Sequence, residues 1–280
     1  MQITARAYAK INWSLNILSA REDGYHELDM LMQRIDLHDT LVFDPAPSVS
    51  LSINGRFIRE PGKNLVYKAA FALSELLKKK RGANIRMTKR IPVRAGLGGG
   101  SADCAVTLMA LNRLWGLNMP REPLIQVANT LGSDVLFCME GIFARVTGTG
   151  DVLTHLQGAR RLPVALIMPY TGLSTREVFT LYDQGGYRSD RLCDNGALAS
   201  AIISGDFKLA RGISHNSLEA PALELLPEIK SYIDQLYLNG AVYAHMTGSG
   251  SCVYGVFETD EAALRAIAAI GRGELTHTRA

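Results

Sequence analysis

The sequence predicts an α+β fold built from two lobes, and three observations support this prediction. A chain of 280 residues, 47% of them hydrophobic, is long enough to fill more than one ordinary core. Alternating apolar and polar residues near the N-terminus indicate strands, whereas the rest of the chain mixes helical spacing with short apolar runs. The pattern loosens near residues 156–162. We therefore expect one domain at residues 1–157 and a second at 158–280.

Each predicted element follows from the spacing of its apolar residues and from the residues that flank it. Asn64 is a candidate N-cap for the first helix, and Gly116 lies just past the end of the second. Three lysines near residue 80 suit the negative end of the first helix. In chain order, the sequence predicts strands at residues 3–18, 42–44 and 49–53, a helix at 64–80, a strand at 84–91, helices at 102–114 and 122–130, strands at 142–146 and 163–168, helices at 195–203 and 222–237, strands at 242–246 and 253–257, and a helix at 260–270.

Charge and hydropathy exclude several classes of function. The 30 basic and 27 acidic residues give a formal net charge of +3, so no strong field marks a nucleic acid or a membrane surface as the main partner. A small anionic substrate is compatible with this balance. No stretch approaches the roughly 18 apolar residues of a membrane-spanning helix, and the N-terminus does not resemble a signal peptide. We expect a cytoplasmic protein.

The cysteines do not predict a metal site. None of the four belongs to a CxxC pair or has a histidine at metal-ligand spacing. Their apolar surroundings favour small buried side chains in a reducing compartment. They are Cys104, Cys138, Cys193 and Cys252.

The glycine-rich stretch before the second helix is a candidate phosphate-binding loop. Glycines allow positive φ and close approach of the backbone to a ligand, and the first turn of a helix that begins near Ser101 offers free N–H groups to an anion. A flexible turn before a core helix is the alternative interpretation. The stretch is not a Walker A motif, because no lysine followed by Ser or Thr comes after it, and Ser101 replaces the last glycine of GxGxxG. A different class of phosphate-binding protein is needed.

The same stretch carries a resemblance to a known family. PVRAGLGGGSAD, residues 92–103, resembles the ATP motif of the GHMP kinases, in the form typical of the branch that acts on cytidine diphosphate-linked methylerythritol. Three further segments resemble the same family in the same order: residues 7–41 with AYAKINWSLNI and REDGYHELDMLMQRIDLHDTL, residues 131–141 with LGSDVLFCMEG, and residues 246–257 with MTGSGSCVYGVF. The resemblance therefore covers nearly the whole chain.

The resemblance implies a fold and an activity. The fold is the two-lobed GHMP architecture, with an N-terminal lobe like ribosomal protein S5 domain 2 and a C-terminal ferredoxin-like α/β sandwich. The activity is transfer of a phosphoryl group from ATP to the 2-hydroxyl of the cytidyl substrate. It requires Mg²⁺, for which we assign no protein ligands, and we expect a monomer or a weak homodimer. The alternatives are a GHMP kinase for a mevalonate-type or homoserine substrate, and a nucleotide-binding protein without catalysis.

The resemblance assigns the catalytic roles to Asp134 and Lys10. Asp134 would accept or orient the proton of the substrate hydroxyl, although an aspartate that caps a helix is the alternative interpretation. Lys10 is unusual within a strand-like run. Unpaired charges are costly to bury, so a pair between these two residues would account for both. The segment departs from the family, which usually has alanine before the aspartate and proline two residues after it.

The resemblance also implies the ligand-binding residues. Tyr25 and His26 would recognise the cytosine ring, and Phe179 would complete the stack, although aromatic residues of this kind also serve as half-buried anchors. Thr175 and Asn12 are further candidates for substrate contacts. Residues 182–195 align with nothing in the family pattern. For ATP, the expected contacts are Pro92, Val93, Arg94, Ala95, Gly96, Leu97, Gly98, Gly99, Gly100, Ser101 and Ala102 in the loop, with Asn64 and Lys89 at the adenine pocket unless they act as an N-cap and a strand-end lysine.

Overall fold

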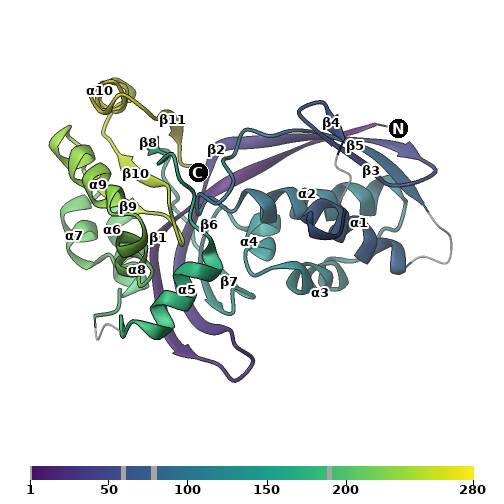
Figure 1. Ribbon diagram of the computed structural model, residues 1–280, viewed down its shortest axis with the longest axis horizontal. Helices are drawn as coiled ribbons and strands as arrows, with labels where there is room; N and C mark the ends of the chain where they lie inside the picture. The colour runs from purple at the N-terminus through teal and green to yellow at the C-terminus, as the bar shows by residue number, and fades with distance from the viewer. Residues whose placement is uncertain (1, 58–60, 77–80, 188–190) are drawn as a thin grey trace. The chain divides into compact units, whose positions relative to one another are not determined.

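The computed structural model describes residues 2–57, 61–76, 81–187 and 191–280, which fall into two compact units (Figure 1). The first unit comprises Met1–Ala9, Leu37–Pro92 and Gly98–Gly141, and the second comprises Lys10–Asp36, Val93–Leu97 and Ile142–Ala280. The units are discontinuous along the chain because the first two strands each pass from one unit into the other. The predicted boundary between residues 157 and 158 concerns family domains and stays a prediction.

The first unit is a sheet covered by helices on one face (Figure 1). Its strands follow the order β4, β3, β5, β2, and β1 pairs with β2. β5 is antiparallel to β2, with Thr40 opposite Thr88, and parallel to β3. The elements are β1 (Ile3–Ala20), β2 (His26–Ala46), β3 (Ser50–Ile53), β4 (Arg56–Phe57), the short 3₁₀ helix η1 (Pro61–Lys63), α1 (Leu65–Glu75), β5 (Gly82–Thr88), α2 (Gly99–Leu114), α3 (Arg121–Leu131) and α4 (Val135–Glu140).

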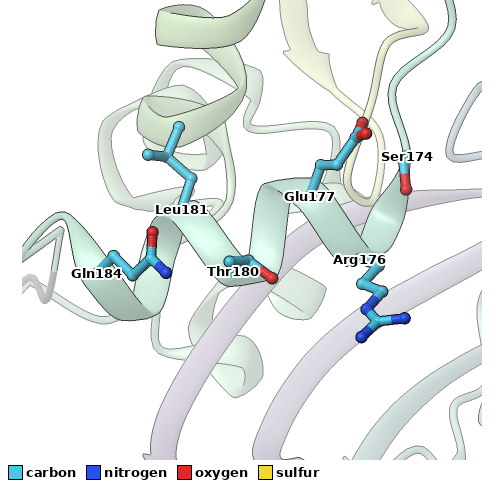
Figure 2. A pocket seen from close by; sticks show the side chains of 6 residues that line it. All are labelled: Ser174, Arg176, Glu177, Thr180, Leu181 and Gln184. Carbon is cyan, nitrogen blue, oxygen red and sulfur yellow. The ribbon is translucent and has the colours of Figure 1, made fainter.

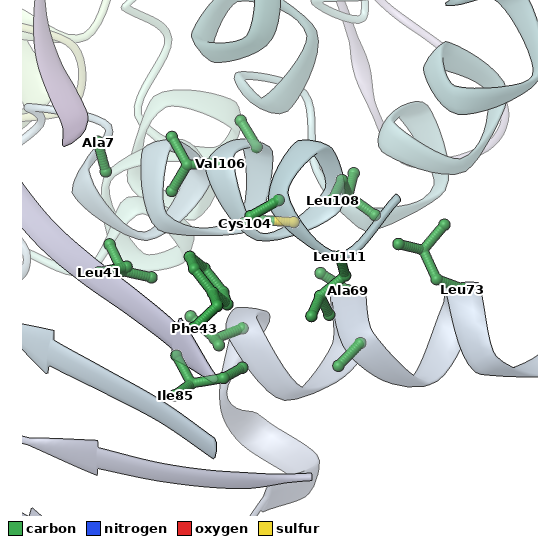
Figure 3. Packing of buried hydrophobic residues seen from close by; sticks show 14 of the residues in the cluster. Ala7, Leu41, Phe43, Ala69, Leu73, Ile85, Cys104, Val106, Leu108 and Leu111 are labelled. Atoms are coloured by element: carbon green, nitrogen blue, oxygen red, sulfur yellow. The ribbon is translucent and has the colours of Figure 1, made fainter. Parts of the chain in front are cut away.

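The core of the first unit forms because strand and helix periodicities meet on one surface. Alternate residues of β5 are buried, so that Ile85 points inward with Phe43 of β2. Opposite them lie Ala69 of α1 and the small or aliphatic residues of α2, among them Cys104 (Figure 3). α2 is buried along most of its length, and this packing fixes the position of its first turn.

The second unit contains the remaining strands of this seven-stranded sheet and a separate four-stranded sheet. In one, the N-terminal half of β2 pairs with β6, which pairs with β7. The other is antiparallel, in the order β11, β8, β10, β9, and α9 and α10 pack against it. The elements are β6 (Phe143–Gly148), β7 (Val152–His155), β8 (Pro163–Ile167), α5 (Thr175–Gln184), α6 (Asn195–Ser204), α7 (Phe207–Ile213), α8 (Glu219–Leu225), α9 (Glu228–Leu238), β9 (Tyr243–Met246), β10 (Val253–Val256), α10 (Asp260–Ile270) and β11 (Glu274–His277).

Most predicted elements are present, with three kinds of difference. The helix predicted at 222–237 is two helices, because Pro227 disfavours helical backbone at Leu226, whose φ is −145°. α2 begins at Gly99, three residues earlier than predicted, and β2 is far longer than the strand expected at 42–44. The sequence did not predict β4, η1, α4, β7, α5, α7 or β11. Residues 77–80 of the first predicted helix, and with them its three terminal lysines, lie outside the described residues.

The four cysteines are buried and free, as predicted. Burial raises the pKa of Cys104 to about 12 and that of Cys193 to about 11, so these thiols are protonated at neutral pH. In the part of the chain that the structure describes, no helix combines the length and the apolar character needed to cross a membrane.

Candidate functional site

The glycine loop leads directly into α2 in the first unit. Gly98 occupies the N-cap position with φ of 69°, a left-handed conformation that glycine adopts without a steric penalty. Its carbonyl accepts the N–H of Ala102 at 2.9 Å. By helix geometry, the N–H groups of Gly99, Gly100 and Ser101 have no intrahelical acceptor. This helix start, residues 98–101, therefore offers backbone donors and the positive end of a helix dipole to an anion.

A buried ion cluster, which we call the Lys89 cluster, lies behind this helix start. It consists of Asp39 on β2, Lys89 just after β5 and Asp103 on α2. The Lys89 ammonium lies 2.5 Å from Asp39 Oδ2 and 2.7 Å from Asp103 Oδ2. Burial would lower the pKa of Lys89, but Asp103 and Asp39 outweigh burial and hold that pKa above its usual value. Burial also raises the pKa of Asp103 to about 7, assisted by the neighbouring Asp39 and opposed by Lys89.

Asp134 lies at the start of α4 in the first unit. It occupies the N-cap position in a helical conformation, with φ of −84°, and its side chain makes no capping hydrogen bond. Asp134 therefore occupies the cap position of the alternative interpretation, without the side-chain hydrogen bond of a capping residue. Its carbonyl still accepts the N–H of Cys138 at 3.0 Å, and its side chain is half-buried. The packing of α4 against α2 holds Asp134 in a defined position within this unit.

Lys10 lies on β1 in the second unit, where its side chain is only 4% exposed. Its ammonium donates to Asn12 Oδ1 at 2.6 Å, and its backbone N–H donates to the carbonyl of Leu97 at 3.1 Å. Asn12 was a candidate for substrate contact, and its amide oxygen is instead directed at Lys10. The hydroxyl of Tyr254 donates to Asn12 O at 2.8 Å, so two hydrogen bonds hold the backbone of this part of β1.

A second glycine segment, residues 247–250, lies close to Lys10 in the same unit. We call it the C-terminal glycine loop. A Cβ on Gly248 would lie 3.2 Å from Lys10 Nζ, and a Cβ on Gly96 would lie 2.0 Å from the carbonyl oxygen of Thr247. Glycine suits both positions for two reasons: a Cβ would crowd these neighbouring atoms, and both residues have positive φ. Asn216 holds the loop from the other side by donating to Met246 O and Gly248 O.

The predicted substrate residues gather around α5, also in the second unit. Thr175 contacts the C-terminal glycine loop through a hydrogen bond of 2.9 Å to Ser249 Oγ. The rings of His26 and Phe179 contact one another with centroids 4.9 Å apart and their planes tilted by 33°. His26 Nε2 lies 2.8 Å from Asp183 Oδ1. Tyr25 is 61% exposed. The structure thus brings His26 and Phe179 together as expected and leaves the ring of Tyr25 accessible.

The surface of α5 next to these residues is hollowed. A cavity of about 430 Å³ is lined by residues of this helix and its N-cap (Figure 2). Arg176 and Glu177 point from the first turn, and Thr180 and Gln184 continue the polar lining toward the end of the helix (Figure 2). The lining combines these polar groups with apolar surface, including Leu181.

The remaining predicted site residues are placed as follows. Asn64 caps α1 by accepting the N–H of Val66 at 2.8 Å, so the interpretation as an N-cap is confirmed. Pro92 ends one segment of the first unit, Ala102 is buried in α2, and Val93, Arg94, Ala95 and Leu97 form the segment of the second unit that leads toward the helix start. Lys10 and Asp134 belong to different units, and their pairing stays a prediction.

Sequence reasoning missed several residues that hold the site. Asp39 and Asp103 could have been recognised, because a charged residue in an otherwise apolar strand or helix is as unusual as Lys10 was in its strand. Asn216, Asp183 and Tyr254 gave no such signal, since polar and tyrosine side chains are common in half-buried positions.

Two family models match the chain. The model of the GHMP kinases N-terminal domain matches residues 64–142, and the model of the GHMP kinases C-terminal domain matches residues 198–274. Both matches include elements described above, from α1 to α4 in the first case and from α6 to α10 in the second. The chain belongs to the GHMP kinases, and the predicted two-lobed fold is confirmed.

Within this family, several curated relatives carry the same name. The chain is 39% identical over 267 residues to the 4-diphosphocytidyl-2-C-methyl-D-erythritol kinase of Caldanaerobacter subterraneus subsp. tengcongensis, a match that covers 95% of this chain and 92% of the relative. It is 41% identical over 258 residues to the enzyme of the same name from Pelotomaculum thermopropionicum, covering 91% and 89%.

Solved structures agree. A crystal structure of 4-(cytidine 5'-diphospho)-2C-methyl-D-erythritol kinase is 33% identical, with a TM-score of 0.81 and coverage of 99% of this chain and 100% of that chain. The homoserine kinase from Cytophaga hutchinsonii is 19% identical, with a TM-score of 0.71 and coverage of 99% and 94%, and it shares the fold alone.

Proposed function

We propose that this chain transfers the γ-phosphoryl group of ATP to the 2-hydroxyl of 4-diphosphocytidyl-2-C-methyl-D-erythritol, a step in isoprenoid precursor biosynthesis. The observation that carries the proposal is the level of identity, 36–41% over 91–99% of this chain, to relatives that all bear the name of this kinase. The contacts of the site residues are observed independently of the proposal and support it.

The reaction forms one bond and breaks one. The oxygen of the substrate's 2-hydroxyl bonds to the γ-phosphorus, the bond from that phosphorus to the β,γ-bridging oxygen breaks, and ADP leaves. The hydroxyl proton passes to Asp134 or through it to solvent. A loose phosphoryl-transfer transition state makes small demands on the base and large ones on positioning and charge neutralisation. Asp134 accordingly orients the hydroxyl as well as accepting its proton.

Charge neutralisation comes from two groups in the chain. The N–H groups of Gly99, Gly100 and Ser101 donate to the phosphates at the helix start. Lys10 supplies a positive charge, and its contact with Asn12 Oδ1 fixes the direction of its ammonium. Neither group has to reorganise when charge develops, because both are held by the packing described above.

The residues present fit a magnesium ion that accompanies ATP. In the described ranges of the chain, no group of three His, Cys, Asp or Glu residues could hold a metal by itself. This suits Mg²⁺ at a kinase site, which is bound through one or two protein oxygens together with substrate phosphates and water. Ser101 Oγ, half-buried at the helix start in the first unit, is the side-chain oxygen that would hold it. When bound, the ion would neutralise charge on the phosphate oxygens.

At the substrate end, His26, Phe179 and Tyr25 are proposed to recognise the cytosine. The His26 and Phe179 rings lie in tilted contact with one another, and Asp183 fixes the imidazole. These rings provide an aromatic face, and the exposed ring of Tyr25 provides another.

We also propose that the enzyme acts in the cytoplasm, where buried thiols stay reduced, as a monomer or a weak homodimer.

A coupled assay of ADP release tests the function. The chain is supplied with ATP and Mg²⁺, and then with 4-diphosphocytidyl-2-C-methyl-D-erythritol, homoserine, mevalonate or no acceptor. The proposal predicts ADP release that depends on the cytidyl acceptor. Equal or faster release with homoserine or mevalonate would instead assign the chain to another GHMP activity, and nucleotide binding without any release would indicate a protein that has lost catalysis.

A further inference from the structure

Within the first unit, the Lys89 cluster contacts the residues just before the glycine loop and the helix just after it. We propose that Lys89 is a positioning residue, which acts on ATP by fixing the backbone of the helix start rather than by contacting the adenine base. The inference rests on the proposed use of ATP and goes beyond it, because it assigns Lys89, Asp39 and Asp103 a joint role in phosphate binding.

Asp39 fastens the beginning of the loop. Its Oδ1 accepts the backbone N–H of Arg90 at 2.5 Å and that of Ile91 at 2.9 Å, and these are the two residues before Pro92. Its Oδ2 accepts from the Lys89 ammonium. All of the Asp39 side chain is buried, so these contacts are not diluted by water.

Asp103 and Gly99 fasten the end of the loop. Asp103 lies in the second turn of α2, and its Oδ2 accepts from the same Lys89 ammonium at 2.7 Å. Gly99 lies directly against the cluster, since a Cβ there would come within 2.8 Å of Ile91 Cγ2 and 3.2 Å of Lys89 Nζ. One ammonium therefore ties the residues that precede the loop to the helix that follows it.

The energetics of burial make this tie dependent on the lysine. Asp39 is 0% and Asp103 4% exposed, and the buried Asp103 Oδ1 has no hydrogen-bond partner among the described residues. Two buried carboxylates repel one another unless a cation lies between them. Without the ammonium, Asp103 either takes up a proton or moves toward water. In both cases the link between Asp39 and α2 is lost, and the first turn of α2, with the N–H groups offered to phosphate, is held less firmly.

A comparison of two ligands separates this role from a contact with adenine. ATP contains the base and the phosphates, whereas inorganic tripolyphosphate contains the phosphates alone. The binding of each, in the presence of MgCl₂, is measured by titration calorimetry for the parent chain and for Lys89→Met. The expected result is that both ligands bind more weakly by the same factor, about tenfold, as is typical when a group that orients a binding site is removed.

The matched control is Lys230→Met. Lys230 also pairs with a carboxylate, Asp234, but does so on the exposed surface of α9. We expect no change for either ligand in this variant. Hydrogen exchange provides a structural readout: the amides of residues 98–103 should exchange faster in Lys89→Met and at the parent rate in Lys230→Met.

Three outcomes would overturn the inference. A loss for ATP with no loss for tripolyphosphate would mean that Lys89 contacts the base. Unchanged binding of both ligands would remove Lys89 from the site, and failure of the parent chain to bind tripolyphosphate at millimolar concentration would show that the loop is not a phosphate site. If Lys89→Met does not fold, Asp103→Asn carries the same test, since it keeps an oxygen for the ammonium. An equal loss of about threefold for both ligands is then expected.

The role of Lys89 and the proposed function are tested separately. If the parent chain shows no turnover with the cytidyl acceptor, the proposed function is contradicted, but the comparison of ATP and tripolyphosphate binding still tests Lys89. Conversely, normal turnover with a loss confined to ATP would contradict the role of Lys89 alone.

Discussion

The molecule contains two glycine-rich segments that look alike in sequence but are held in different ways. The helix start at residues 98–101 leads into α2, and it lies on a cluster of one ammonium and two carboxylates. The C-terminal glycine loop at residues 247–250 is held by neutral hydrogen bonds from Asn216 and Thr175. The glycines of the first segment lead into a helix whose first N–H groups can bind an anion, whereas those of the second permit one backbone to touch another.

A glycine motif alone therefore does not define a phosphate site. Donors that are aimed at a ligand come from a helix start, and the position of that helix start depends on what packs behind it. The C-terminal glycine loop instead fixes Lys10 and the segment that precedes the helix start. We therefore predict that changes near the helix start alter ligand binding and turnover, whereas changes that disturb the C-terminal glycine loop alter the free energy of unfolding.

The largest expected effect lies at Asp134, in the same unit as the helix start. Asp134→Asn removes the proton acceptor but keeps the shape of the side chain, so we expect turnover to fall by about 10²–10⁴-fold with ATP affinity nearly unchanged. Steady-state kinetics and calorimetry measure the two quantities. Asp234→Asn, on the exposed surface of α9, serves as the control. Near-normal turnover in Asp134→Asn would remove this residue from the role of base.

The next largest effect separates two glycines of the same motif. In Gly96→Ala the new Cβ would meet Thr247 O at 2.0 Å in a residue with φ of +73°, so we expect a loss of roughly 2 kcal/mol or more in the free energy of unfolding. Gly100→Ala adds a Cβ whose nearest contact is Leu65 Cδ1 at 3.4 Å, inside a helix, so stability should hold or rise. Urea unfolding of both variants checks this. Equal losses in both would contradict the distinction between a glycine that packs against the C-terminal glycine loop and a glycine of the helix start.

A third prediction concerns pH and the Lys89 cluster. The folded-state pKa of Asp103, about 7, lies above the unfolded value of 3.8 because the carboxyl is buried near Asp39. The folded chain therefore binds the extra proton between about pH 4 and pH 7, and this group makes the free energy of unfolding fall as pH rises through that window. The slope cannot exceed about 1.4 kcal/mol per pH unit for one proton.

Asp103→Asn isolates this contribution. The asparagine does not titrate, so the stability of the variant relative to the parent should increase between pH 5 and pH 8, while other groups cancel in the difference. Urea unfolding of both chains at several pH values provides the measurement. A difference that stays constant with pH would show that Asp103 does not titrate in this range.

The smallest effect is expected at Tyr254, which supports the strand carrying Lys10. Tyr254→Phe removes the hydroxyl that donates to Asn12 O and leaves that buried carbonyl without this donor. The free energy of unfolding should fall by about 1 kcal/mol, with turnover reduced more than ATP affinity. Tyr170→Phe is the control, because Tyr170 is almost fully exposed. If the two variants are equally stable, the hydrogen bond from Tyr254 contributes nothing.

The sequence predicted the parts of this molecule that depend on local pattern. The alternation of β5, the spacing of α2 and the N-cap at Asn64 all follow from short-range rules, and the strong motifs identified the family. Pro227 shows the limit of apolar spacing, since it divides a helix that periodicity alone would continue. α5 was missed although it carries Thr175 and Phe179, because few apolar residues mark its buried face.

What could not be predicted depends on contacts between residues far apart in the chain. The sequence alone indicates that Lys89 is a strand-end lysine. Only the structure shows that its ammonium contacts Asp103 and also Asp39, which lies fifty residues earlier in the chain. Asn12 was a candidate for substrate contact, and only the folded chain shows that its amide oxygen accepts from the Lys10 ammonium. Sequence spacing identifies which residues carry chemistry more readily than it identifies which residues hold them in place.

The most direct test of the account is ³¹P NMR of the product formed from ATP and 4-diphosphocytidyl-2-C-methyl-D-erythritol. The carbon that bears the 2-hydroxyl also bears the methyl group and has no hydrogen. The account therefore predicts a new phosphomonoester resonance without coupling to a proton on the ester carbon. A doublet or triplet from such a proton, or the absence of any new phosphomonoester, would contradict it.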